Sequence, residues 1–337
     1  MIFLIEQLVS DKDAGLGEDN QSDVSVSSVH TSDLSDFSDI SSSSENDEPL
    51  EWSDFIIEPQ HEEFCSFVGP TKPLGLDASP VDYFFQLFPM MLINNIVEQT
   101  NLYAEQKGAV NFIPTCVSEI RAYLAILLLM GIVQLPNYRC YWSRRPVLNI
   151  PAISEIMSRN RYEQITRYFH LNDCSQNPPR TSPDHDKLHK VRPILDNAKQ
   201  QFASHYQPHK NLCVDEAMIK YKGRCSFLQY LPCKPTKWGV KAWGLADSES
   251  FYLIDFNIYI GKDSKSANNL PLGTRVVTDL VKNYYMKNHH VYFDNYFTSV
   301  DLMETLLSKK TYACGTVRLN RCGLPADIKN CKLKKFW

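Results

Sequence analysis

The chain lacks several patterns that would place it in a specialised class of proteins. Its 10 cysteines are spread singly with no CxxC pair, so their spacing predicts neither a zinc ribbon nor a redox motif. The first residues, MIFLIEQLVS, have no basic region before a very short apolar run, which is unlike a signal peptide. The longest apolar run, residues 122–133, is well below the ~18 residues that span a bilayer. We therefore expect an intracellular protein with reduced thiols and no membrane partner.

Basic residues are nearly missing from the first 63 positions, which hold 17 acidic residues and 1 basic residue. The full chain holds 39 acidic and 35 basic residues, which leaves 22 acidic and 34 basic residues in positions 64–337. The net charge is therefore −16 in the first segment and +12 in the remainder. A basic body suits a polyanion such as DNA, because lysine and arginine release counterions from phosphates. A solubilising surface would give the same charge balance.

Composition divides the chain into a tail and two folded domains. Residues 1–65 are rich in Ser, Asp and Glu and have too few apolar residues to form a core, so we expect a disordered tail. Residues 79–207 carry apolar residues at helical spacing, and the run 118–133 predicts a helix buried at the domain centre. After residue 208, segments rich in β-branched and aromatic residues predict strands, so the whole fold class is mixed α/β.

The strand-rich domain has a recognisable order of elements. Strands are predicted at 211–219, 237–246, 251–260, 289–297 and 311–319, with helices at 273–286 and 299–310. Three strands followed by alternating helices and strands describe a mixed sheet, and this is also the order of ribonuclease H-like domains. In such a sheet the first and fourth strands can lie side by side.

Two aspartates lie in or beside these apolar strands, where a charge is costly unless it is paired or binds a metal. Asp215 lies within the first strand, and Asp294 lies near the end of the fourth. If the strands are neighbours, the two carboxylates form a hard oxygen site suited to Mg²⁺ and to two-metal phosphodiester chemistry. In the structural alternative, Asp215 pairs with a nearby lysine and Asp294 caps the turn into its helix. The residues by themselves favour the structural alternative.

Basic residues form two groups that could contact phosphates and so position DNA without specifying its sequence. The first group is Lys220, Lys222, Arg224, Lys234, Lys237 and Lys241, and the second is Arg144 and Arg145, near Arg159, Arg161 and Arg167. Ordinary exposed side chains are an equal alternative for any one of them. Trp238 and Trp243 could stack on an unpaired base, but their strand spacing favours core packing for both.

Five segments resemble the successive signature segments of piggyBac-type transposases, and they occur in family order. They are SPVDYFFQLF, VDEAMIKYKGR, KPTKWGVKAWGLAD, VYFDNYFTS and GTVRLNR, within residues 79–337. The resemblance implies a helical dimerisation and DNA-binding domain at 79–207 and a ribonuclease H-like catalytic domain at 208–337. It also implies that Asp215 and Asp294 are the first and second catalytic aspartates and bind Mg²⁺ or Mn²⁺. That implication reverses the preference for a structural role.

The implied activity is cutting and joining of double-stranded DNA at transposon ends and TTAA targets, by a homodimer in the nucleus. Family members carry a third catalytic aspartate and a cysteine-rich zinc-binding domain farther along, and neither has a match in this sequence. Asp327 is a weak candidate for the third acid, and Glu216 and Asp301 are weaker. We therefore expect a catalytic domain truncated at its carboxyl end. The alternative function is that of a catalytically inactive, transposase-derived protein that binds DNA or chromatin.

Overall fold

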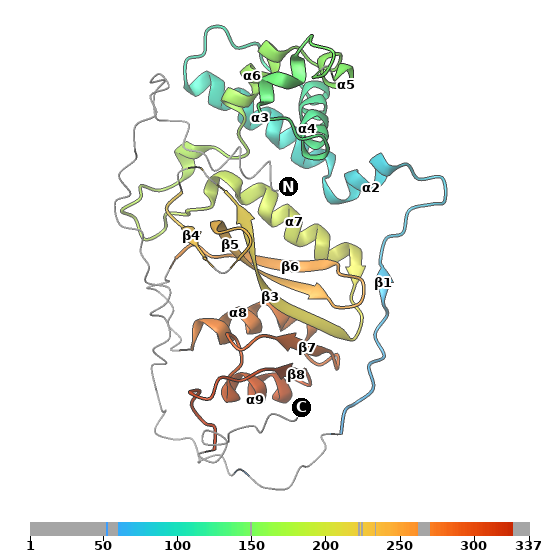
Figure 1. The fold of residues 1–337 in the computed structure, drawn as a ribbon, viewed down its shortest axis with the longest axis vertical. Coiled ribbons are helices and arrows are strands. Elements are labelled where there is room, and N and C mark those ends of the chain that lie inside the picture. The colour runs from blue at the N-terminus through green and yellow to red at the C-terminus, as the bar shows by residue number, and fades with distance from the viewer. Residues whose placement is uncertain are drawn as a thin grey trace. The chain divides into compact units, whose positions relative to one another are not determined.

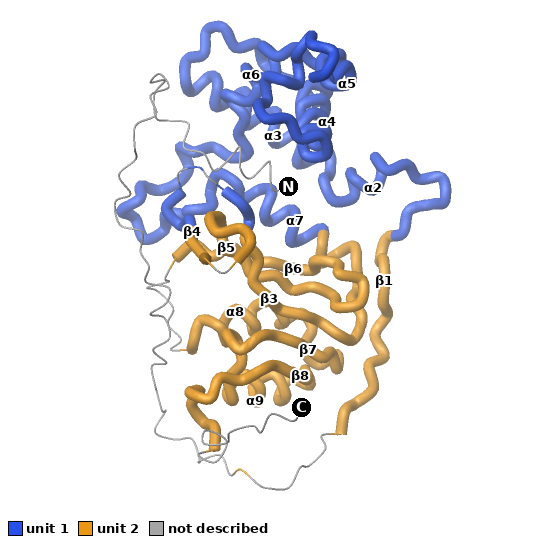
Figure 2. The backbone as a smooth tube through the Cα atoms, viewed as in Figure 1, with its two compact units in different colours: residues 1–19, 73–201, 219–228 blue, residues 20–72, 202–218, 229–337 orange. Residues whose placement is uncertain are grey.

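The structure is a computed structural model that describes residues 52, 60–148, 150–221, 223, 225–232, 234–261 and 270–325. The chain forms two compact units (Figure 1, Figure 2). The described part of unit 1 comes from residues 73–201 and 219–228, and that of unit 2 comes from residues 20–72, 202–218 and 229–337. None of the helices in the described residues is long and apolar enough to cross a membrane.

Unit 1 is helical, as its apolar periodicity predicts. Its helices are α2 (Pro80–Leu87), α3 (Met90–Gln106), α4 (Val117–Ile132), α5 (Pro151–Ser154), α6 (Arg159–Tyr168) and most of α7 (Arg192–His205). Short 3-10 turns are η2 (Tyr138–Trp142), η3 (Cys174–Gln176) and η4 (His189–Val191). The backbone N–H of Ser79 donates to the Asp82 carboxylate at 2.8 Å, and Pro80 occupies the first helical position. These contacts explain why α2 begins where it does.

The core of unit 1 forms where α3 packs against α4 and α6. Its most deeply buried residues include Ile93, Ile96, Ile120, Ile126 and Ile165. The predicted helix at 118–133 forms as α4, but it is not buried on every side, because Leu128 and Ile132 are 51% and 79% exposed. These two residues continue an exposed stripe that begins at Arg121 and follows helical spacing. The helix therefore has one buried face and one face on the surface of the unit.

Within unit 1, Arg161 joins α6 to α4. Its guanidinium donates to Glu119 Oε1 at 2.8 Å and to Glu119 Oε2 at 2.6 Å. It also donates to the Ile113 carbonyl at 2.9 Å. The hydrogen bond from Arg161 outweighs partial burial and holds the pKa of Glu119 below its ordinary value. This arginine belongs to the predicted basic cluster, but in the structure it forms a bidentate salt bridge with Glu119 within the unit.

Unit 2 contains most of a six-stranded sheet. The strands are β3 (Asn211–Lys220), β4 (Leu228–Tyr230), β5 (Trp238–Asp247), β6 (Leu253–Ile258), β7 (His290–Phe293) and β8 (Tyr312–Gly315). Their order is β4-β5-β3-β7-β8, and β6 also pairs with β5. β5 and β6 are antiparallel, whereas β3, β7 and β8 are parallel neighbours, so the predicted mixed sheet is confirmed. The predicted pairing of the first and fourth long strands is confirmed as well, because β3 lies beside β7.

Helices α8 (Leu272–Val281) and α9 (Val300–Ser308) pack against this sheet (Figure 1). α8 contacts β5 and β6, α9 contacts β8, and the 3-10 turn η5 (Lys282–Tyr284) follows α8. The core of the unit includes Leu212, Val214, Leu245, Ile254, Val277, Val291 and Leu302. Alternate residues of β3 and β7 thus enter the core, and this packing fixes the register between the two strands.

Residues 60–72, which we call the strap, belong to unit 2 and contact its sheet. Its strand β1 (Gly69–Pro70) pairs antiparallel with β2 (Tyr206–Gln207). The Glu62 backbone N–H donates to the Tyr312 hydroxyl at 2.9 Å, and the Glu62 carboxylate pairs with Lys310 at 2.6 Å. The His61 ring lies edge-on to the ring of Tyr312, with centroids 4.3 Å apart. His61 and Glu62, which the sequence assigns to the tail, therefore contact the strand β8 (Tyr312–Gly315) and the residue Lys310 before it.

Asp247, the last residue of β5, is fully buried and accepts five hydrogen bonds. The donors are the Tyr206 hydroxyl, the His209 ring at 2.7 Å, the Ser250 hydroxyl at 2.8 Å and the backbone N–H groups of His209 and Glu249. Burial would raise the pKa of Asp247, but the hydrogen bonds led by His209 outweigh it and lower that pKa. The bond to Asp247 in turn raises the pKa of His209. This cluster ties the entry to β3 to the end of β5.

Candidate two-aspartate site

Asp215 and Asp294 occupy matching positions on two paired strands. β3 and β7 are parallel, and Val214 is the register partner of Phe293. The next residue along each chain segment is an aspartate, so the two aspartates directly follow this last register pair. Both residues are exposed. Because ligands of open α/β sheets bind at the carboxyl ends of parallel strands, the end of β7 beside β3 is a suitable place for a site.

Each aspartate uses one carboxylate oxygen to bind its own backbone. Asp215 Oδ1 accepts from the N–H of Glu216 at 2.7 Å, and Asp294 Oδ1 accepts from the N–H of Tyr296 at 3.0 Å. The Asp294 carbonyl also accepts from the Thr298 hydroxyl at 2.9 Å. Among the described residues, neither carboxylate takes part in an ion pair. Asp294 thus caps its turn, as the structural alternative expected.

Two lysines near Asp215 pair with the following residue, Glu216. Lys234 Nζ lies 3.2 Å from Glu216 Oε1, and Lys241 Nζ lies 3.0 Å from Glu216 Oε2. Burial would raise the pKa of Glu216, but the charges and hydrogen bonds of the two lysines outweigh it, and its pKa lies below the ordinary value. Glu216 is therefore committed to these lysines, which argues against its use as a third metal ligand.

Two arginines that follow β8 in the sequence donate hydrogen bonds to the turn after Asp294. Arg318 Nε donates to Asn295 Oδ1 at 3.0 Å. Arg321 Nη2 donates to the carbonyls of Asn295 and Tyr296 at 3.0 and 2.6 Å. Sequence reasoning gave these arginines no role, although both lie in the GTVRLNR segment that carries part of the family resemblance. The only signal in the sequence was this motif, because their partners lie more than 20 residues away.

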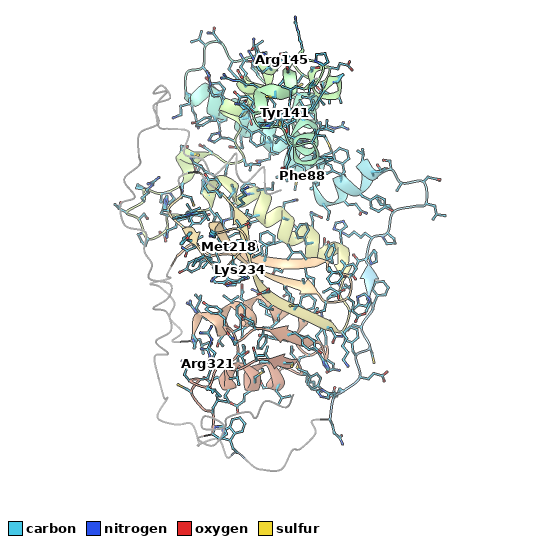
Figure 3. The ribbon with its side chains drawn as sticks, in the orientation of Figure 1. Phe88, Tyr141, Arg145, Met218, Lys234 and Arg321 are labelled. Carbon is cyan, nitrogen blue, oxygen red and sulfur yellow. The ribbon has the colours of Figure 1, made fainter. Side chains whose placement is uncertain are left out.

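The predicted DNA-contacting residues are spread over the two units. Lys234 belongs to unit 2 and Arg145 to unit 1, and Figure 3 labels both side chains. Lys220 and Lys237 are exposed, and so are Arg144 and Arg145, which lie between η2 and α5. Lys241 is mostly buried, and Lys234 is partly exposed beside Glu216. Lys222 and Arg224 lie outside the described residues.

The two tryptophans of β5 have different environments. Trp243 is buried in the core of unit 2, as its strand spacing predicts. The prediction of core packing is wrong for Trp238, which is 41% exposed and lies with its ring centroid 4.7 Å from that of Tyr230. Trp238 is the first residue of β5 and pairs with an aromatic residue of the short strand β4, so the core does not reach it.

Comparison with known proteins places this arrangement in a family. Human PiggyBac transposable element-derived protein 2 is 32% identical over 269 residues, which cover 77% of this chain and 44% of that protein. Human PiggyBac transposable element-derived protein 5 is 27% identical over 298 residues, covering 82% of this chain and 55% of that protein. A family profile described as Transposase IS4 matches residues 79–335. The chain belongs to the piggyBac-type transposase family.

The piggyBac-type fold is also shown by a solved structure. A cryo-EM structure of a piggyBac transposase synaptic complex with hairpin DNA is similar with a TM-score of 0.71 and 30% sequence identity. The similarity covers 80% of this chain and 57% of that one. The chain thus spans about half the length of the piggyBac-type proteins that it matches. The mixed α/β fold class predicted from the sequence is confirmed by this match.

A DDE-type family such as piggyBac implies a divalent metal, and the two aspartates fit one chemically. Mg²⁺ is commonly held by one or two carboxylates together with waters and substrate phosphates, and Asp215 and Asp294 supply two such carboxylates. Within the described ranges, no group of three or more His, Cys, Asp or Glu residues could hold a metal. Asp301 lies in the first turn of α9, and Asp327 lies outside the described residues. The described candidate site therefore offers two carboxylates.

Proposed function

We propose that the chain is a piggyBac-type transposase, or a derivative of one, that binds DNA and cuts and joins DNA strands at TTAA sites. The single observation that carries this proposal is the position of Asp215 and Asp294 directly after the last register pair of β3 and β7. The similar solved structure is described as a complex with hairpin DNA, which supports DNA as the partner. Membership of a transposase family supports the class of reaction.

In this proposal Asp215 and Asp294 hold the metal with the oxygens that do not bind the backbone. When bound, Mg²⁺ or Mn²⁺ would supply positive charge for activating an attacking water or 3′ hydroxyl and for stabilising the leaving oxygen. The backbone hydrogen bonds to Oδ1 of each aspartate fix the direction of its carboxylate. Arg318 contributes by holding the turn after Asp294 through Asn295.

The proposed partner is double-stranded DNA, which includes transposon ends and TTAA targets. The exposed side chains of Lys220, Lys237, Arg144 and Arg145 are the described candidates for phosphate contacts. We further propose that the protein acts as a homodimer in the nucleus. Sedimentation of the full chain with and without duplex DNA tests the dimer, and fractionation of cells that express it tests the location.

Strand cleavage by the full chain tests the catalytic part of the proposal. Labelled duplexes with transposon ends flanked by TTAA are incubated with protein and Mg²⁺ or Mn²⁺. Nicking should fall by about 100-fold or more in Asp215→Asn and Asp294→Asn, because even changes to groups behind metal ligands cost 10–100-fold. Glu304→Gln, a change of an exposed acid on α9, is the matched control and should nick like the wild type. Equal nicking by wild type and Asp215→Asn would refute the assignment.

A second candidate function is suggested by the human relatives, which are described as derived from transposable elements. In this case the chain binds DNA without cutting it. Binding of wild type and Asp215→Asn should then be equal and should weaken steeply with salt, since phosphate contacts release counterions. Lys237→Met should lower the slope of the logarithm of the binding constant against the logarithm of salt by about 1. Binding that does not depend on salt would argue against DNA as the partner under either function.

A further inference from the structure

The ammonium group of Lys241 is enclosed by a carboxylate and three aromatic rings. Its Nζ lies 3.0 Å from Glu216 Oε2 and 5.1 Å from the centre of the Tyr296 ring. The rings of Trp243 and Tyr259 have their centres 5.6 and 6.0 Å from the same atom. The Lys241 side chain is only 12% exposed. Such an ammonium gains from both the ion pair and the faces of the rings.

Two of these contacts are to residues that bind the aspartates. Glu216 follows Asp215 in β3, and its backbone N–H donates to the Asp215 carboxylate at 2.7 Å. Tyr296 follows Asp294 by two residues, and its backbone N–H donates to the Asp294 carboxylate at 3.0 Å. One lysine side chain therefore touches both residues whose N–H groups fix the two carboxylates.

The strand order explains how one side chain reaches both places. Lys241 is on β5, β3 is its neighbour, and β7 lies beyond β3. Neighbouring strands are about 4.8 Å apart, so β5 and β7 are separated by roughly 10 Å. A long, unbranched lysine stem can cross beside β3 and place its charge near the turn after β7. A short side chain at this position would leave the two turns without this common contact.

We propose that Lys241 is a positioning residue that holds the turns of Asp215 and Asp294 in the relative arrangement that a shared metal requires. This inference rests on the proposed function, since the site that Lys241 serves is the one proposed there. Lys241 acts through Glu216 and Tyr296. The sequence suggested a phosphate contact for this lysine, but a mostly buried ammonium already paired with a carboxylate is less available to DNA than the exposed lysines of the same domain.

Hydrogen exchange of the full chain without metal tests the link itself. Lys241→Met keeps the apolar stem but removes the charge, and the backbone N–H groups of Glu216 and Tyr296 should then exchange about tenfold faster. Lys241→Arg should exchange like the wild type, because arginine also pairs with carboxylates and stacks on aromatic rings. Lys282→Met is the matched control, since it removes an ion pair with Asp279 at 2.7 Å on another part of the unit.

Binding of Mn²⁺, followed by electron paramagnetic resonance of the free ion, tests the consequence for the site. Asp215→Asn should lose most of the affinity, and Lys241→Met should lose about tenfold, the size of effect seen when groups that orient metal ligands are removed. Lys241→Arg should restore the affinity, and Lys282→Met should not change it. Glu216→Gln removes the same ion pair from the other side and should also weaken binding, so it replaces Lys241→Met if that variant does not fold by circular dichroism.

The outcomes separate this inference from the proposed function. If Asp215→Asn lowers Mn²⁺ affinity while Lys241→Met and Glu216→Gln do not, the positioning role is overturned and the proposed function stands. If Asp215→Asn leaves Mn²⁺ affinity unchanged, the proposed metal site fails. Hydrogen exchange then decides alone whether Lys241 couples the two turns. Faster exchange at both amides supports the coupling, and faster exchange only at Glu216 overturns it.

Discussion

Replacing Asp247 with alanine should strongly destabilise unit 2. The carboxylate has no exposed surface and accepts five hydrogen bonds. Alanine removes all of these acceptors at once. The donors on Tyr206, His209, Glu249 and Ser250 must then find other hydrogen-bond acceptors, either water or one another.

The expected loss can be worked out from the exposure of those donors. Hydrogen bonds to charged groups contribute about 1.5–3 kcal/mol each, and a simple sum over five of them would overestimate the stability that is lost with one residue. The His209 side chain is 34% exposed, and Ser250 and Glu249 are on the surface, so water can replace part of the loss. Breaking a buried pair by removing one partner costs about 3–5 kcal/mol, and partial rehydration places Asp247→Ala near the lower end, at about 3 kcal/mol.

Urea unfolding followed by tryptophan fluorescence measures this loss, because Trp243 is buried in the core of the same unit. A loss of about 3 kcal/mol should lower the urea midpoint by roughly 1.5 M at an ordinary slope of about 2 kcal/mol per M. Glu249→Gln is the matched control, since its carboxylate is 3.8 Å from His209 and half exposed, and it should change the stability by less than about 0.5 kcal/mol. A similar, small midpoint shift in both variants would refute the reasoning.

Three further predictions concern pH, close packing and a charge pair. The His209–Asp247 contact has a raised His209 pKa and a lowered Asp247 pKa, so its contribution should be full between about pH 4 and 6.5. This contribution should be lost as the pH rises through the folded pKa of His209 or falls through that of Asp247. Urea midpoints of the wild type and His209→Gln, measured across pH 4–9, should therefore converge at high pH. A constant difference between the two midpoints would contradict this prediction. Gly315→Ala should lower the free energy of unfolding by about 1–3 kcal/mol in thermal denaturation, because an added Cβ would lie 2.5 Å from the Thr298 hydroxyl and 2.8 Å from the Phe293 carbonyl. An unchanged melting temperature would show that these two groups move aside without cost. Arg161→Met should lower the free energy of unfolding of unit 1 by about 2 kcal/mol in urea, since it leaves a half-buried Glu119 without its bidentate partner. If Arg161→Lys restored the wild-type stability, the bidentate geometry would not be needed.

Long elements with strong local patterns could be predicted from the sequence. The run at 211–219 is apolar and β-branched enough to specify β3 within one residue of its observed end. The aromatic run at 289–297 misled, because β7 ends at Phe293 and the next residues form a turn around the Asp294 carbonyl. An apolar run does not show at which residue a strand ends and a hydrogen-bonded turn begins. Strands β1 and β2 have two residues each and are separated by residues 71–205 in the sequence, so no local pattern could reveal them.

The candidate site was predictable only as far as topology determines it. Element order suggested that the strands of Asp215 and Asp294 are neighbours, and the register of β3 and β7 agrees. The choice of partner for Lys241 was not predictable, because Asp215 and Glu216 follow each other in the sequence and the strand pleat places them on opposite faces of the sheet. The exposure of Trp238 was hidden for a similar reason: whether a strand begins inside or beyond the core depends on the length of its neighbours.

The strap determines where a recombinant form of this protein should begin. The match to the transposase family starts at residue 79, but residues 60–72 belong to unit 2 and contact Tyr312 of β8. A protein shortened to the matched region would lose the Glu62 contacts to Tyr312 and Lys310 and the partner strand of β2. Uncovered strands and aromatic side chains at the end of a sheet favour association between molecules. Expression from residue 60 or earlier should therefore give more monodisperse material than expression from residue 79.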